Sequence, residues 1–173
     1  MIGIILIGKS NSGKSILGKT IAEQLGIRYI SSGDIARNMN GIQDNLNSGE
    51  LAPEEKMRSE IVRKIISCNV SYILDGFPRF YDQYEWLNQT VAHKLIYIYI
   101  DVPDEDILSR ATSRNRSDDG SINKKMQFFK DNTEPMMHKI LDNETVYIIE
   151  NGNDKNINDN INKLSTIIER YLC

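Results

Sequence analysis

Eight consecutive residues near the start of the chain have the spacing of a phosphate-binding loop. They read Gly8-Lys9-Ser10-Asn11-Ser12-Gly13-Lys14-Ser15 and fit the pattern G-x-x-x-x-G-K-[ST]. Glycines at positions 8 and 13 let the backbone wrap around an anion with its N–H groups pointing inward. The Lys14 ammonium is long enough to reach the β- and γ-phosphates, and the Ser15 hydroxyl is suited to Mg²⁺. The pattern predicts a site for a nucleoside triphosphate or a molecule built like one.

The segments on either side of this loop have the character that the motif requires. Ile2–Ile7 is a short apolar run of the kind found in buried strands, and Leu17, Ile21 and Leu25 follow at a four-residue spacing. A helix that begins near Gly13 directs its partial positive charge at a bound phosphate. A chance match in a Gly/Ser turn is the alternative, and the strand and helix in register argue against it.

Apolar runs suited to buried parallel strands alternate with helical patterns along the chain. These runs are Ile2–Ile7, Arg28–Ile30, Ser71–Leu74, Leu95–Ile100 and Thr145–Ile149. Alternation of this kind predicts an α/β fold, a three-layer α/β/α sandwich around a parallel sheet of about five strands. At 173 residues the chain is expected to form one P-loop domain over residues 1–173.

Three helices are expected from their apolar faces. Two begin at a proline followed by acidic residues, which favour a helix N-terminus. The inward-facing residues are Met57, Ile61 and Ile65 after Pro53, then Ile107, Leu108 and Ala111 after Pro103, and Ile157, Ile161, Leu164 and Ile168 in the last helix.

Composition excludes several classes of protein. The net charge of −3 gives no general attraction to nucleic acid or to an anionic membrane. No apolar run reaches the roughly 18 residues of a membrane span, and the start of the chain shows no leader pattern. Cys68 and Cys173 lack metal-binding spacing and are expected to be reduced thiols in a cytoplasmic protein. His93 and His138 lie outside the motifs and are expected to be structural or surface residues.

Two later segments supply further groups that bind phosphate or metal. Ser32-Gly33-Asp34 is followed by Arg37, and Asp75-Gly76-Phe77-Pro78-Arg79 follows an apolar strand. Asp75 therefore lies at the carboxyl edge of the predicted sheet, where ligands bind in open α/β folds. Its carboxylate is suited to holding Mg²⁺ through water. The forked guanidinium groups of two arginines suit a second phosphate better than a casual surface pair.

Together these segments resemble the nucleoside monophosphate kinases, most closely the adenylate kinase group in its short-lid form. The matching residues are Gly33, Asp34 and Arg37 in the pattern (S/T)-(T/A)-G-D-x-x-R, and Asp75 to Arg79 with Gln83 in the pattern D-G-F-P-R with a later glutamine. The resemblance implies that ATP is the phosphoryl donor and that Mg²⁺ is required, held by Ser15 and, through water, by Asp75, with Asp34 as a further candidate through water. It also implies an acceptor site made by Ser32, Gly33, Arg37, Gly76, Arg79 and Gln83, in which Gln83 reads the base.

An arginine-rich lid completes the resemblance. Arg110 is expected beside the donor base, and Arg114 and Arg116 at the transferring phosphoryl group. Lys125 aligns with a later arginine of the family. Lysine keeps the positive charge at this position but lacks the forked guanidinium group. The segments expected to close over the substrates, about 34–69 on the acceptor side and 114–125 in the lid, are both short for the family.

AMP is the expected acceptor, because Gln83 offers both a donor and an acceptor to the Watson–Crick edge of adenine. UMP, CMP or a deoxynucleoside monophosphate remains an alternative, as does a catalytically weak relative that binds nucleotide as a scaffold or regulator. A kinase for a small non-nucleotide alcohol would not need two acceptor-side arginines, and a guanine-nucleotide switch would need an N-K-x-D segment that the sequence lacks. An active monomer is the family expectation.

Overall fold

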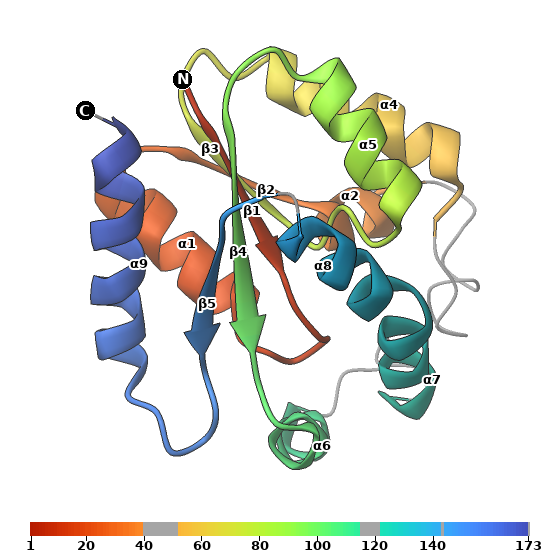
Figure 1. Cartoon of the computed structure of the whole chain (residues 1–173), viewed down its shortest axis with the longest axis vertical. Coiled ribbons are helices and arrows are strands. Elements are labelled where there is room, and N and C mark those ends of the chain that lie inside the picture. The colour runs from red at the N-terminus through yellow and green to blue at the C-terminus, as the bar shows by residue number, and fades with distance from the viewer. Residues whose placement is uncertain (40–51, 115–121, 143, 173) are drawn as a thin grey trace.

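Five parallel strands form one sheet in the order β2-β3-β1-β4-β5 (Figure 1). The computed structural model describes residues 1–39, 52–114, 122–142 and 144–172. The strands are β1 (Gly3–Ile7), β2 (Arg28–Ser31), β3 (Tyr72–Asp75), β4 (Leu95–Asp101) and β5 (Val146–Glu150). One sheet of five parallel strands, with helices between the strands along the chain, confirms the α/β architecture expected from the sequence.

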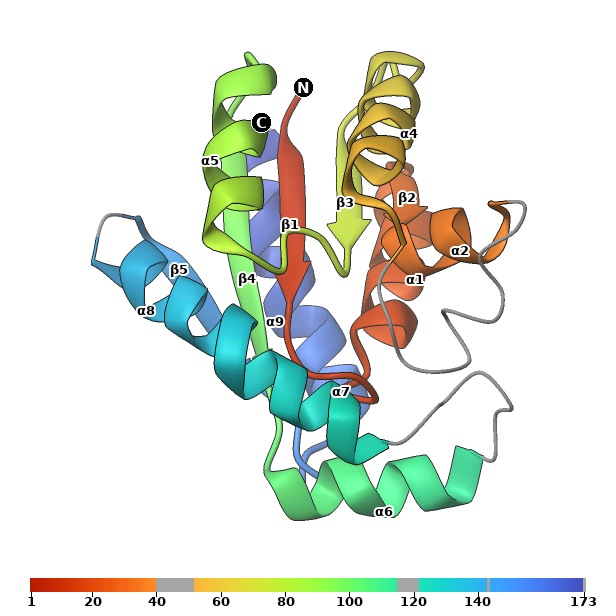
Figure 2. The same ribbon diagram turned by 90° about the vertical axis from the view of Figure 1, so that its right-hand side faces the viewer.

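Helices cover both faces of this sheet (Figures 1 and 2). One face carries α1 (Lys14–Leu25) and α9 (Ile157–Leu172), and the other carries α4 (Glu54–Ile66), α5 (Tyr81–Thr90) and α8 (Glu134–Leu141). The remaining described helices are α2 (Ser32–Arg37), α6 (Asp104–Arg114), α7 (Ile122–Phe128) and the short π-helical turn η1 (Phe129–Thr133).

The central strand β1 explains why the sheet needs helices on both sides. Ile4 and Leu6 pack into the core beneath α1 and α9, whereas Ile5 and Ile7 pack into the core beneath α4, α5 and α8. All four side chains are buried. Because successive side chains in a strand point to opposite faces, a run that is apolar throughout marks a strand covered on both faces.

Two residues expected to face inward are instead exposed. Leu108 is 41% exposed and Ile157 is 39% exposed. The helix α6 lies across the carboxyl ends of the strands and not flat on the sheet, so Ile107 is buried while Leu108 faces outward (Figure 2). Ile157 is the first residue of α9, and the predicted core residues that follow it, Ile161, Leu164 and Ile168, are buried.

The strand order predicts where a ligand binds. β1 pairs with β3 on one side and with β4 on the other, so the chain leaves its carboxyl end at the point where the strand order reverses. In open parallel sheets, ligands bind in the crevice at such a point. The loop from Gly8 to Gly13 begins at this end of β1. No helix in the described part of the chain is long and apolar enough to cross a membrane.

Candidate active site

The loop between β1 and α1 is closed around the ammonium group of Lys14. Its Nζ donates to the backbone carbonyl of Gly8 at 2.8 Å, to that of Lys9 at 2.6 Å, and to Ser12 Oγ at 3.2 Å. Burial lowers the pKa of Lys14 to about 8, although the Asp75 carboxylate acts in the opposite direction. A desolvated ammonium held by carbonyl groups is positioned to exchange them for phosphate oxygens, which bind it more strongly.

Two glycines are required where the loop makes its closest contacts. A Cβ on Gly8 would lie 2.6 Å from the carbonyl oxygen of Ile100, and one on Gly13 would lie 2.5 Å from Asn151 Nδ2. Gly13 also has a φ of 90°, which L side chains rarely adopt. Asn11, where the family usually has glycine, has a φ of 61°. Asparagine enters this left-handed region more readily than most residues, so the loop keeps its path.

Oxygen atoms suited to binding Mg²⁺ meet where the start of α1 contacts the end of β3. Ser15 Oγ donates to Asp75 Oδ2 at 2.7 Å, and Tyr29 OH donates to the same oxygen at 2.6 Å. A hydroxyl and a carboxylate are hard oxygen donors, which Mg²⁺ prefers, usually alongside water and phosphate oxygens. No cluster of three or more metal-binding side chains exists among the described residues. The hydroxyl of Ser15 and the carboxylate of Asp75 are donors of the kind that suits Mg²⁺.

A residue from the far end of the chain closes the other side of the loop. Asn151, directly after β5, donates from Nδ2 to the carbonyl of Ser12 at 2.8 Å. Asn160 of α9 donates to Asn151 Oδ1 at 2.9 Å and orients its amide. Arg110 of α6 donates to the carbonyl of Asn151 at 2.6 Å and to that of Asn11 at 3.4 Å. Arg110 therefore contacts the phosphate-binding loop, and its position beside the donor base stays a prediction.

One cavity of about 260 Å³ is lined both by the phosphate-binding loop after β1, called the donor loop below, and by the residues expected to bind the acceptor, called the acceptor side. The predicted site residues that line it are Gly8, Ser10, Asn11, Lys14, Ser15, Ser32, Gly33, Arg37, Asp75, Gly76, Arg79, Gln83 and Lys125. These residues come from the end of β3, from the loops after β1 and β3, and from the helices α1, α2, α5 and α7. The sheet and its loops therefore bring three separate sequence motifs together around one space.

Arg79 reaches into this space from the turn that follows β3. Its Nε donates to the carbonyl of Gly76 at 2.9 Å, and among the described residues its two Nη atoms have no hydrogen-bond partner. Burial lowers the pKa of Arg79 from its ordinary value, against the attraction of Asp75. A guanidinium with its fork unused in a cavity is arranged to bind an anion in a bidentate manner.

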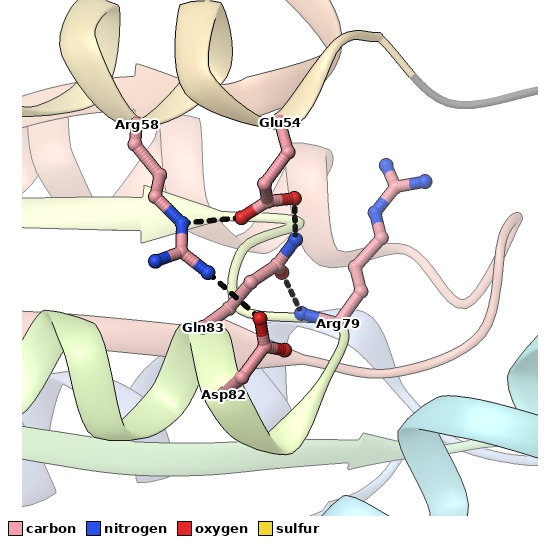
Figure 3. Close-up of polar contacts among 5 residues, drawn as sticks. All are labelled: Glu54, Arg58, Arg79, Asp82 and Gln83. Carbon is pink, nitrogen blue, oxygen red and sulfur yellow. Dashed lines mark hydrogen bonds and ion pairs between the residues drawn. The ribbon is translucent and has the colours of Figure 1, made fainter.

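Gln83 is buried, with 3% of its surface exposed, and both ends of its amide are engaged. Its Oε1 accepts from the backbone N–H of Arg79 at 2.7 Å, and its Nε2 donates to Glu54 Oε2 at 2.6 Å. Figure 3 shows this contact and the charged residues beyond it, with the Arg79 guanidinium extending away from them. The glutamine expected to read the base is therefore oriented by two protein groups.

Ser32 is the second buried polar residue at the acceptor side. It is 3% exposed, lines the cavity, and its Oγ has no hydrogen-bond partner among the described residues. A buried hydroxyl without a partner costs free energy, on the order of 1–3 kcal/mol. A ligand that supplies a partner relieves this cost, so Ser32 remains a candidate for binding the acceptor.

Some predicted residues occupy other positions. Lys9 turns away from the cavity and pairs with Asp104 at 2.6 Å, so that its backbone carbonyl alone contacts Lys14. Asp34 pairs with Arg37 and is not among the cavity-lining residues, and its role in metal binding stays a prediction. Arg116 lies outside the described residues, and the side chain of Arg114, at the end of α6, is likewise outside them.

Three residues of the site were not identified from the sequence as part of it. Tyr29 donates to Asp75, Glu54 accepts from Gln83, and Asn151 closes the donor loop. Asn151 directly follows the carboxyl end of β5, which is a usable sequence signal, whereas Tyr29 is the second residue of β2 and had no such signal. Glu54 stood out in the sequence only as an acid in the first turn of a helix.

Comparison with known proteins agrees with this geometry. A family model described as an AAA domain matches residues 7–125. The chain is 30% identical to adenylate kinase 1 of Synechocystis sp. (strain PCC 6803) over 151 residues, which cover 78% of this chain and 81% of that protein. It is 35% identical to an adenylate kinase of Encephalitozoon cuniculi over 124 residues, 67% of this chain and 68% of that protein.

A further relative is matched over a smaller share of its own length. The chain is 37% identical to an adenylate kinase of Ruminiclostridium cellulolyticum over 126 residues, which cover 64% of this chain and 58% of that protein's length. The family model covers residues 7–125, and most of the residues that line the cavity lie within this range. The chain belongs to the adenylate kinase family of nucleoside monophosphate kinases, which are phosphotransferases built on a P-loop.

Proposed function

We propose that this protein transfers the γ-phosphoryl group of ATP to a nucleoside monophosphate, with AMP as the preferred acceptor. The observation that carries this proposal is the shared cavity, which is lined both by Lys14 and Ser15 of the phosphate-binding loop and helix α1 and by Arg79 and Gln83 after β3. Phosphoryl transfer needs two phosphate-bearing substrates in line, and one cavity with cations from both sides meets that need.

The chain's own residues perform the remaining work by position and charge. Lys14 binds the donor phosphates, Arg79 binds the acceptor phosphate through its unused fork, and Lys125 adds a positive charge from the α7 side of the cavity. Bound Mg²⁺ neutralises charge on the donor phosphates, and Ser15 and Asp75 are the residues that would hold it. No side chain is required as a covalent nucleophile, since the acceptor phosphate attacks directly.

The same proposal includes closure of the acceptor segment, about 34–69, and of the short lid, about 114–125, over bound substrates. Exclusion of water in this way prevents hydrolysis of the triphosphate. Arg114 and Arg116 would then contact the phosphoryl group that is being transferred. A cytoplasmic, monomeric enzyme is part of the proposal on sequence grounds alone.

The test mixes purified protein with ATP, Mg²⁺ and one of AMP, CMP, UMP, GMP or dTMP, and separates the products by ion-exchange chromatography. Stoichiometric formation of ADP from ATP and AMP, lost in Lys14→Ala, is the expected result. Faster conversion of UMP or CMP would keep the reaction and correct the substrate. Binding of ATP with no transfer to any acceptor would overturn the proposal and favour a regulatory relative.

A further inference from the structure

The orientation of the Gln83 amide is determined by its surroundings. The backbone N–H of Arg79 can only donate, so the group that it meets at 2.7 Å must be the amide oxygen of Gln83. The amide nitrogen then faces Glu54 Oε2, a carboxylate that can accept, at 2.6 Å. One N–H of Gln83 therefore remains for a ligand, while its oxygen is already engaged by the backbone.

Glu54 is held beside this amide by a basic partner. Arg58 Nε donates to Glu54 Oε1 at 2.5 Å, and Arg58 Nη2 donates to Asp82 Oδ2 at 2.8 Å (Figure 3). The Arg58 guanidinium also lies 5.1 Å from the centre of the Trp86 ring. Arg58 occupies Glu54 Oε1 on the side away from Gln83, so Oε2 is the oxygen shared with the glutamine.

Glu54 nonetheless remains open to the cavity. Its side chain is 40% exposed, and it lines the same cavity as Gln83 and Arg79. Apolar side chains, among them Met57 and Phe77, line the same cavity and suit the faces of a flat base. The partly exposed Glu54 carboxylate and the Gln83 amide N–H thus form an acceptor–donor pair in a cavity that apolar side chains also line.

We infer that Glu54 reads the acceptor base together with Gln83, accepting a hydrogen bond from an exocyclic amino group on that base. The inference rests on the proposed function. In adenine the 6-amino group would donate to Glu54 Oε2, and the adjacent ring nitrogen N1 would accept from the remaining Gln83 N–H. Glu54 is therefore a specificity-determining residue. The Gln83 side chain alone does not accept from the amino group, because its carbonyl oxygen is engaged by the Arg79 N–H.

This pairing of Glu54 and Gln83 predicts an order of preference among acceptor nucleotides. Cytosine carries the same sequence of amino group and unprotonated ring nitrogen, so CMP is the expected second acceptor. Hypoxanthine and guanine have an oxygen at position 6, and uracil has one at position 4, and each would oppose the carboxylate. A site with a polar group aimed at one edge rejects analogues that leave this group without a partner.

The experiment measures equilibrium binding of AMP, IMP and purine riboside 5′-monophosphate by calorimetry without ATP, so that it does not depend on turnover. IMP reverses the polarity of the base edge, and the purine riboside lacks only the amino group. We expect the wild-type protein to bind AMP at least about tenfold more tightly than either analogue. Equal affinity for AMP and purine riboside 5′-monophosphate would overturn the inference whatever any variant does.

The variant Glu54→Gln tests whether the preference for AMP over IMP depends on the Glu54 carboxylate. In this variant the oxygen of the new amide stays with Arg58 and its NH₂ group faces the base, so the ratio of AMP to IMP affinity is expected to fall at least about tenfold. The matched control is Glu55→Gln, which removes the same charge from the same first turn at an exposed position. Its ratio should stay within about twofold of wild type.

The outcomes separate this inference from the proposed function. An unchanged AMP to IMP ratio in Glu54→Gln would overturn the role of Glu54, even if ATP and AMP are converted to ADP. Conversely, a Glu54-dependent preference for AMP in a protein that transfers no phosphoryl group would keep this inference and overturn the proposed function.

Discussion

The side-chain carbonyl of Gln83 accepts a hydrogen bond from the backbone N–H of Arg79 at 2.7 Å. The residue proposed to face the acceptor base is thus in direct contact with the residue proposed to bind the acceptor phosphate. The carbonyl of Arg79 also accepts from Thr133 Oγ1 at 3.1 Å, which connects the same turn to the end of η1. A change at position 83 is therefore expected to affect both ends of the acceptor site.

Replacement of Gln83 by methionine tests this connection. Gln83→Met leaves the Arg79 N–H without its buried partner, which typically costs on the order of 1–3 kcal/mol of unfolding free energy. We also expect a higher KM for the acceptor and an unchanged KM for ATP, measured alongside thermal unfolding. Gln127→Met is the control, because Gln127 is exposed on α7 and bonds only with Asp131 among the described residues. Equal effects of the two substitutions would contradict the buried connection.

The ammonium of Lys14 is expected to be essential for transfer and dispensable for folding. Lys14→Ala removes a preorganised cation from the donor phosphates, so kcat/KM should fall by about a hundredfold or more. Circular dichroism should show an unchanged fold, since the core beneath α1 is formed by other residues such as Leu17 and Ile21. Lys19→Ala, an exposed change in the same helix, is the control. Normal turnover by Lys14→Ala would mean that the loop is not the donor site.

Binding of ATP should weaken as the pH rises through about 8. Burial lowers the pKa of Lys14 to about 8 in the free protein. The triphosphate favours the charged form, so above this pKa each binding event takes up a proton, and affinity falls by up to about tenfold per pH unit. The measurement titrates ATP in EDTA between pH 7 and 9.5, which keeps metal out of the comparison. Lys14→Met should bind weakly at every pH, and a flat wild-type profile would contradict the shift.

Tyr29 is expected to control how well Asp75 holds its metal. Its hydroxyl donates to Asp75 Oδ2 at 2.6 Å, the oxygen that also accepts from Ser15. Tyr29→Phe removes this orienting bond, and loss of such a partner commonly weakens metal binding about tenfold or more. The concentration of Mg²⁺ for half-maximal rate should rise accordingly, whereas Tyr147→Phe, whose hydroxyl bonds with Tyr171, should not change it. Identical Mg²⁺ dependence in Tyr29→Phe and wild type would exclude this role.

The five strands and the helices α1, α4, α6 and α9 were predictable because each has a local signal, whereas α2, α5, α7, η1 and α8 were not predicted. The strands begin and end close to the expected apolar runs, and α4 begins at Glu54 directly after Pro53. The orientation of α6 had no such signal, and Leu108 was placed inside for this reason. Contacts between elements were also beyond prediction. Glu54 and Gln83 are 29 residues apart, and Tyr29 and Asp75 are 46 apart, so these contacts depend on how the helices and strands pack.

The hydrogen bond from Asn151 to Ser12 joins residues 139 positions apart. During synthesis the phosphate-binding loop is made well before its partner, because Asn151 is added only after β5 is complete. Contacts of such long sequence separation form late in folding because they close a large loop. A nascent chain that stops before β5 therefore carries the whole sequence motif without a finished nucleotide site, and nucleotide binding reports that synthesis has passed that strand.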